Sequence, residues 1–267
     1  EMCIRDRFAY SAFTKGLSSK WCYRQRTIEG ISELFNPVED AICKSLIPAI
    51  LGRNVDSFER DMLALPLRYG GLGIQNPAKT ADREYEASKR ITRQLTDLIF
   101  NQDQDLSQLD RSLINNTKAE LRLEKEKSYA AEKSRLENLI TSEAKKRAFS
   151  IASEKGSSSW LSALPLRSLG YCLNKKDFRD SLLLRYNWPI PDVCKHCACG
   201  KKNSVNHALT CKKGGYVSFR HDVLVETEAE LLREAKCRNV YTEPSLLPSS
   251  SQFHPKGTIT ADGARLD

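Results

Sequence analysis

Four cysteines and two histidines lie close together in the second half of the chain. Four of these residues have the spacing Cys-x2-Cys-x9-His-x3-Cys: Cys194, Cys197, His207 and Cys211. Thiolates and imidazoles are the donors that hold structural zinc in a tetrahedron. The Cys-x-x-Cys pair suits a tight turn, and His-x3-Cys suits one turn of helix, because residues four apart share a helix face. The pattern predicts a closed structural Zn²⁺ site with these four ligands.

Two alternatives remain open at this cluster. His196 and Cys199 lie inside the loop and are candidate substitute ligands, and the cysteines could also be reduced thiols without a metal. The other five cysteines are scattered singly, at Cys3, Cys22, Cys43, Cys172 and Cys237. An odd count with one dense Cys/His cluster is typical of reduced thiols and a metal site rather than of a disulfide framework.

The predicted metal site lies in a strongly basic stretch. Residues 194–221 contain no acid and six cations: Lys195, Lys201, Lys202, Lys212, Lys213 and Arg220. Cations on a small rigid module bind phosphate with little sequence selectivity, so these six are candidate nucleic-acid contacts. The alternative is a solubilising surface around a folding staple.

A second candidate contact lies near the start of the chain. Residues 20–26 interleave cations with aromatic side chains, and the cations are Lys20, Arg24 and Arg26. Such a pattern suits contact with a nucleic-acid backbone and stacking on bases. An amphipathic helix with Trp21 in the core explains the same pattern equally well.

The whole chain has 267 residues, with 42 Lys and Arg against 34 Asp and Glu, and a formal charge of +8. No apolar run approaches the roughly 18–20 residues of a membrane span, so the sequence predicts no membrane segment. The length allows two small domains, and the charge favours anionic partners. We expect a mainly α fold with a small zinc module and marginal β structure at the C-terminus.

The elements that position the cluster are helices. Residues 78–155 contain no Gly and no Pro, which predicts two or three helices with a break near 101–105 and a further candidate break at Asn115–Asn116. Between Lys118 and Arg147, 15 of 30 residues are charged, which favours a solvated helix face over a face that tracks nucleic acid. Residues 156–159 are predicted to be a hinge, followed by helices near 176–186 and 220–237.

The first 77 residues are predicted to be short helices separated by Gly and Pro turns. Asn36 precedes Pro37 in the pattern of a helix N-cap followed by proline at the first helical position. Gly70-Gly71-Leu72-Gly73 lacks the Lys and Ser/Thr of a phosphate-binding loop, so we interpret it as a turn between residues 67–69 and 72–74.

Several stretches together resemble one family, the polyproteins of non-LTR retrotransposons that pair a reverse transcriptase with a C-terminal restriction-like endonuclease. Residues 63–74, with the string Pro-Leu-Arg-Tyr-Gly-Gly-Leu-Gly, resemble the thumb just after the polymerase palm, and residues 19–49 resemble the region before it. Residues 160–166, 178–186, the Cys/His cluster and Arg220-His221-Asp222 resemble the linker and zinc knuckle before the endonuclease. The resemblance begins near Phe13 and spans nearly all of the remaining chain.

The resemblance implies four regions: a thumb-like helical region at 1–100, a charged helical linker at 101–155, a zinc-knuckle module at 156–220 and a truncated nuclease start at 221–267. It implies a nucleic-acid-binding fragment whose partners are retroelement RNA and target DNA, with no membrane and no small-molecule substrate. The location implied is the nucleus, with a cytoplasmic ribonucleoprotein stage.

The resemblance also implies where catalysis belongs. The polymerase aspartates would precede residue 1, and Asp267, or Asp262 as second choice, would be the first acid of an incomplete nuclease site. Mg²⁺ would act only in the complete parent RNA-directed DNA polymerase and endonuclease. The alternative function is a host zinc-module scaffold whose long helices bind partner proteins.

Overall fold

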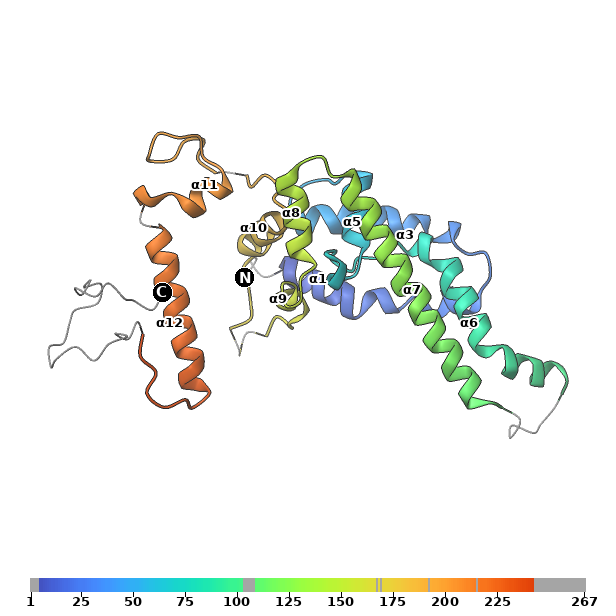
Figure 1. The fold of residues 1–267 in the computed structure, drawn as a ribbon. Helices are drawn as coiled ribbons and strands as arrows, with labels where there is room; N and C mark the ends of the chain where they lie inside the picture. Colours follow the sequence, from blue (N-terminus) through green and yellow to red (C-terminus); the bar gives the residue numbers. More distant parts are fainter. Residues whose placement is uncertain are drawn as a thin grey trace. The chain divides into compact units, whose positions relative to one another are not determined.

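The structure is a computed structural model that describes residues 5–102, 109–166, 168, 170–191, 193–214 and 216–242. The described residues are mainly helical, which confirms the predicted fold class (Figure 1). The chain divides into two compact units, Glu1–Pro191 and Asp192–Asp267, referred to here as unit 1 and unit 2. None of the described helices combines the length and the apolar character that a membrane span requires.

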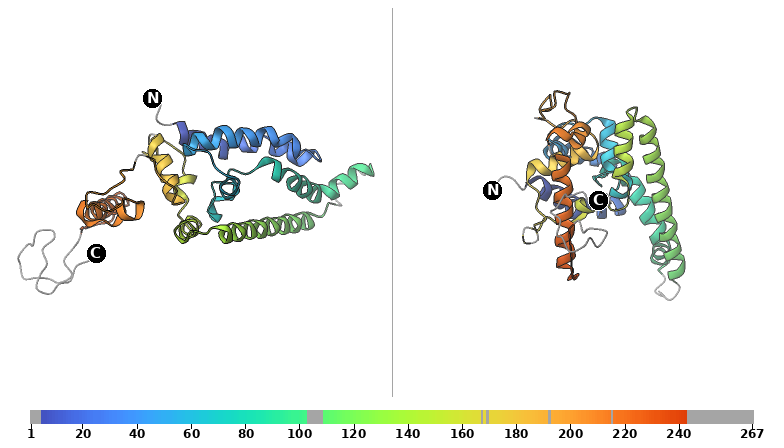
Figure 2. Two further views of the ribbon diagram at one scale, coloured as in Figure 1. Left: turned by 90° about the horizontal axis from the view of Figure 1, so that it is seen from above. Right: turned by 60° about the vertical axis from the view of Figure 1, so that its left-hand side comes forward.

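Unit 1 is built from short helices, with two long ones, α6 and α7, between them. The elements are α1 (Arg5–Lys15), η1 (Leu17–Ser19), α2 (Cys22–Thr27), η2 (Glu33–Phe35), α3 (Asn36–Ala41), η3 (Ile42–Leu46), α4 (Ile47–Leu51), α5 (Ser57–Ala64), η4 (Leu67–Tyr69), α6 (Pro77–Phe100), α7 (Arg111–Leu139), α8 (Glu143–Ala152), α9 (Ser159–Ser162) and α10 (Lys175–Arg185). Figure 2, left, shows the blue helices of residues 5–51 and the green α7 on two sides, with α5 and the turn after it between them.

The long helices begin where side chains cap them. The Asn76 side chain accepts from the Lys79 backbone N at 3.0 Å, and Pro77 occupies the first turn of α6. The Asp110 side chain accepts from the backbone N of Ser112 at 2.8 Å at the start of α7. These caps satisfy N–H groups that have no partner within the helix. The break predicted near 101–105 is confirmed, because α6 ends at Phe100, whereas α7 runs without interruption through Asn115–Asn116.

One apolar core holds unit 1 together. It includes Leu63 and Leu136, each 0% exposed, and Phe178, also 0% exposed, so α5, α7 and α10 share it. Leu161, just after the predicted hinge at 156–159, is buried in the same core. The Ser158 hydroxyl donates to the Leu67 carbonyl oxygen at 3.2 Å. Residues 156–191 therefore pack within unit 1, and the boundary between the units falls after Pro191 rather than at 156.

The glycine string makes the turn that the sequence predicts. Gly70 has φ +87, and the backbone N of Leu72 and of Ile74 both donate to the Leu63 carbonyl oxygen, at 3.1 and 3.2 Å. A Cβ on Gly71 would lie 1.9 Å from the Leu65 carbonyl oxygen, so only glycine fits this approach. The turn brings Leu72 and Ile74 back into the core beside α5.

A buried ion pair fixes the same region. The Arg60 Nε and Nη2 donate to the Glu39 carboxylate at 2.7 and 2.8 Å, and Nη1 donates to the Ile74 carbonyl oxygen at 2.7 Å. Arg60 is only 6% exposed. Asn36 itself has helical dihedral angles, because η2 runs directly into α3, so it is not the N-cap that its sequence context predicts.

Unit 2 has two α-helices among its described residues, α11 (Val205–Thr210) and α12 (Tyr216–Glu234), with the short η7 (Lys212–Gly214) between them. The helix predicted near 220–237 is thus confirmed but begins earlier. Residues 240–242 are not in a strand, and the rest of the predicted β structure, from 243 onward, lies outside the described residues.

Candidate metal centre

The first half of the centre is a single helical turn. The Ser204 hydroxyl accepts from the His207 backbone N at 3.1 Å and caps α11. The Cys211 backbone N donates to the His207 carbonyl oxygen at 2.8 Å. Because residues four apart lie on one helix face, His207 and Cys211 present their side chains to the same point.

The second half is a tight turn. His196 and Lys202 form an antiparallel bridge, and the Cys197 backbone N donates to the Lys201 carbonyl oxygen at 2.9 Å. The Gly200 N donates back to the Cys197 carbonyl oxygen at 2.8 Å, and Gly200 has φ +84, a conformation that favours glycine. Cys197 and Cys199 therefore both lie at the tip of this turn.

These two halves bring four donor atoms together. Cys197, Cys199, His207 and Cys211 each offer one donor atom, and all four atoms lie within 4.8 Å of one another. The sulfurs of Cys197 and Cys211 are 3.6 Å apart, and the Cys199 sulfur is 3.1 Å from His207 Nε2. Tetrahedral ligation at ordinary Zn–S and Zn–N lengths needs separations of roughly 3.3–4 Å, so the sulfur pair fits and the Cys199–His207 contact would have to open slightly. The group could hold a metal ion.

One of the four converging residues differs from the set that spacing predicts. Cys194 is exposed and is not in the group; Cys199 takes its place. The tight turn spans Cys197 to Gly200, three residues later than the Cys194–Cys197 pair suggests. Cys199 was visible as an alternative, but only the turn geometry selects it.

The six predicted phosphate contacts of this module are Lys195, Lys201, Lys202, Lys212, Lys213 and Arg220, and all six are exposed. Lys201 and Lys202 lie on the arm that pairs with residues 195–197, and Lys212 directly follows Cys211. Except for Arg220, which lies on α12, the cations are thus carried by the same stretch of backbone as the four donors. Asp262 and Asp267, the predicted nuclease acids, lie outside the described residues.

The predicted contacts near the start of the chain, Lys20, Arg24 and Arg26, belong to unit 1. The Trp21 ring packs 5.9 Å from that of Phe13, against the core of unit 1, as the amphipathic-helix interpretation predicts. Lys20 and Arg24 are exposed. Arg26 forms an ion pair with Glu84 on α6 at 3.2 Å. Lys20 and Arg24 thus remain open to solvent, whereas Arg26 is engaged with an acid of unit 1.

The chain matches no protein-family model, no curated protein and no solved structure.

Proposed function

We propose that the Cys197, Cys199, His207 and Cys211 group holds one Zn²⁺ and that the module binds nucleic acid, as part of a non-LTR retrotransposon reverse transcriptase with endonuclease. The observation that carries this proposal is the convergence of three thiols and one imidazole inside a stretch of six exposed cations with no acid. Three thiolates and one imidazole form a donor set that suits zinc.

A closed set of four protein donors gives a structural role. It leaves no open position for an activated water, so the metal would order the backbone rather than act in catalysis. An ordered backbone favours binding, because cations on a rigid turn avoid the entropy cost of ordering that turn when they contact a phosphate. The module would therefore hold RNA or DNA through its backbone, with little selectivity for base sequence.

The test is the binding of a labelled DNA duplex to the zinc-loaded full chain over a range of salt concentrations. The variant reverses Lys201, Lys202, Lys212 and Lys213 to Glu. A matched control reverses Lys145, Lys146, Arg147 and Lys155, which are exposed residues of or just after α8, and changes the net charge equally. Each lost phosphate contact flattens the slope of log K against log salt by about 0.9.

The proposal predicts weaker binding and a flatter slope for the module variant than for the control. Equal effects of the two variants would mean that net charge alone drives binding, and the module would lose its role. The retroelement assignment has its own test in the reading frame of the gene: a polymerase aspartate motif upstream and an Asp and Lys strand pair downstream support it, and their absence from an intact frame contradicts it.

One observation favours the scaffold alternative. On α12, Phe219 is 63% exposed, Leu224 is 62% exposed and Leu231 is 60% exposed, so this helix presents large apolar side chains. In a scaffold these residues would bind a partner protein and the zinc would be purely structural. Loss of a copurifying protein on substitution of Phe219 and Leu224 by Ser, with no nucleic-acid affinity in the parent chain, would favour the scaffold.

A further inference from the structure

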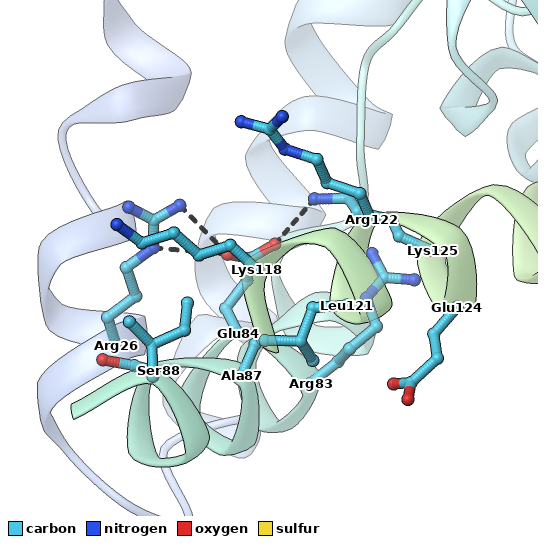
Figure 3. A pocket seen from close by; sticks show the side chains of 11 residues that line it. Arg26, Arg83, Glu84, Ala87, Ser88, Lys118, Leu121, Arg122, Glu124 and Lys125 are labelled. Atoms are coloured by element: carbon cyan, nitrogen blue, oxygen red, sulfur yellow. Dashed lines mark hydrogen bonds and ion pairs between the residues drawn. The ribbon is translucent and has the colours of Figure 1, made fainter. Parts of the chain in front are cut away.

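A cleft of about 550 Å³ lies in unit 1, far along the chain from the Cys/His module, between α2, α6 and α7. Figure 3 shows side chains from the three helices facing this space. Its size falls in the range of roughly 300–1,000 Å³ that is usual for small-molecule and cofactor sites. Part of its wall is apolar, from Ala87, Ile91 and Leu121.

The charged part of the wall is unbalanced. Five cations line the cleft, Arg26, Arg83, Lys118, Arg122 and Lys125, against two acids, Glu84 and Glu124. Glu124 already pairs with Arg90, whose Nη1 lies 2.9 Å from its carboxylate. Lys118 and Arg122 are exposed and form no ion pair with any described residue. Like charges four apart on a helix repel, so this arrangement costs stability unless an anion is nearby.

Glu84 neutralises only two of the five cations. Its carboxylate accepts from Arg26 Nη2 at 3.2 Å and from Lys125 Nζ at 2.9 Å, and the dashed lines of Figure 3 mark both contacts. Burial by itself would raise the pKa of Glu84, but the hydrogen bonds and charges of Lys125 and Arg26 lower it below its usual value. One carboxylate thus serves two cations and leaves none for the other three.

Among these cations, Arg83 is the one with buried donor atoms that lack a hydrogen-bond partner in the described part of the chain. Its Nε and Nη2 are buried and have no hydrogen-bond partner among the described residues. The guanidinium lies 5.5 Å from the centre of the Tyr129 ring, which holds the charge but accepts none of its in-plane N–H groups. Buried donors without acceptors are costly, and a charged donor more than a neutral one. Arg83 also lines a second cavity together with Tyr129, so an acceptor in the cleft would partner these buried donors once the guanidinium turns toward it.

We propose that this cleft binds a phosphate group, with Arg83, Lys118 and Arg122 as its main donors. Phosphate has several strong acceptor oxygens, and the planar fork of arginine matches two of them at once. The apolar wall of Ala87, Ile91 and Leu121 would contact the sugar or base attached to that phosphate. The phosphate could be carried by a nucleic-acid strand or by a free nucleotide. The site lies in unit 1 and does not depend on zinc or on the module proposed above.

The test is calorimetric titration of the full chain with inorganic pyrophosphate at low salt. Arg83→Gln removes the buried donors, and the double variant Lys118→Glu with Arg122→Glu reverses two exposed charges without removing an ion pair. Loss of a hydrogen bond to a charged group corresponds to about tenfold or more in affinity. A matched double control on α7, Arg111→Glu with Lys127→Glu, changes the net charge equally at exposed positions outside the cleft.

The proposal predicts at least tenfold weaker pyrophosphate binding in both cleft variants, and a change of less than about twofold in the control and in the Lys201, Lys202, Lys212 and Lys213 reversal. Thermal unfolding of each variant verifies that it is folded. Absence of pyrophosphate binding, or equal losses in the cleft variant and its control, would overturn the proposal. Competition identifies the source: displacement of a bound RNA oligonucleotide by pyrophosphate assigns a strand, and binding of ATP without such displacement assigns a free nucleotide.

Discussion

Unit 1 and the described part of unit 2 bury very different amounts of apolar surface. Leu63, Leu136 and Phe178 of unit 1 are completely buried in one core that draws on most of its helices. In residues 193–214 and 216–242 of unit 2 the only buried apolar side chain is that of Ala229. The larger apolar residues of α12, such as Phe219 and Leu224, are exposed.

The difference leads us to expect that different interactions stabilise the two units. Burial of apolar side chains stabilises unit 1, since each large side chain removed from water contributes about 1.5–3 kcal/mol. The turn and α11 of unit 2 have no such core, so the four converging donors are the feature that can order them. All three tryptophans, Trp21, Trp160 and Trp188, belong to unit 1, so their fluorescence reports on that unit alone.

Removal of zinc is expected to have the largest effect. Metal binding contributes roughly 10–16 kcal/mol to the folding of small zinc modules at neutral pH. A chelator should therefore abolish amide-exchange protection in residues 193–214 and leave the tryptophan fluorescence of unit 1 unchanged. Exchange mass spectrometry on the zinc-loaded and chelated chain measures both. Persistent protection of the turn after complete zinc loss would show that the two units do not differ in this way.

Exchange of single cysteines sharpens the assignment of the ligands. Loss of a residue that only supports a metal ligand lowers metal affinity by about 10–100-fold. Cys199→Ser removes a donor itself, so it should lower zinc affinity by more than that. Cys194→Ser is the matched control, because Cys194 is exposed and outside the group. Competition with a zinc-binding dye gives both affinities. The reverse order of the two effects would restore Cys194 as the fourth ligand.

A leucine truncation in each unit tests the contribution of apolar burial. Leu136→Ala should lower the free energy of unfolding of unit 1 by about 2–5 kcal/mol, because it leaves a cavity in a closed core. Leu224→Ala should change stability by no more than about 0.5 kcal/mol, because Leu224 is 62% exposed. Urea unfolding followed by fluorescence and by circular dichroism measures the pair. A similar loss for both would mean that α12 is covered in solution.

The smallest expected effect is electrostatic and confined to unit 1. Because the pKa of Glu84 is lowered in the folded chain, its pairing with Lys125 and Arg26 stabilises the fold above the ordinary pKa of a glutamate and is lost as the pH falls through the lowered value. Glu84→Gln should cost about 1 kcal/mol or less near pH 7 and nothing in strong acid. Tryptophan-detected unfolding of both proteins across pH 3–7 measures this convergence, and a constant difference would contradict it.

Much of the helical framework follows from the sequence alone. The absence of Gly and Pro from residues 78–155 predicts α6, α7 and α8, and the break after Phe100 falls where polar residues interrupt the apolar pattern. The glycine turn at 70–73 follows from its composition as well, since Gly70 must adopt a positive φ. These features depend on neighbouring residues, so local propensity and periodicity determine them.

The tertiary structure decided the rest. Spacing identified the Cys/His cluster and three of its four donors, but the choice of Cys199 over Cys194 depends on which residues form the turn between Cys197 and Gly200. The buried Arg60–Glu39 pair joins two residues that are 21 positions apart in the sequence, on α5 and α3. The charge pattern of α7 favours a solvated face, and only the approach of α2 and α6 places Arg83 beside the α7 cations of the cleft. Such pairings arise when distant segments pack together, and no local pattern encodes the partner.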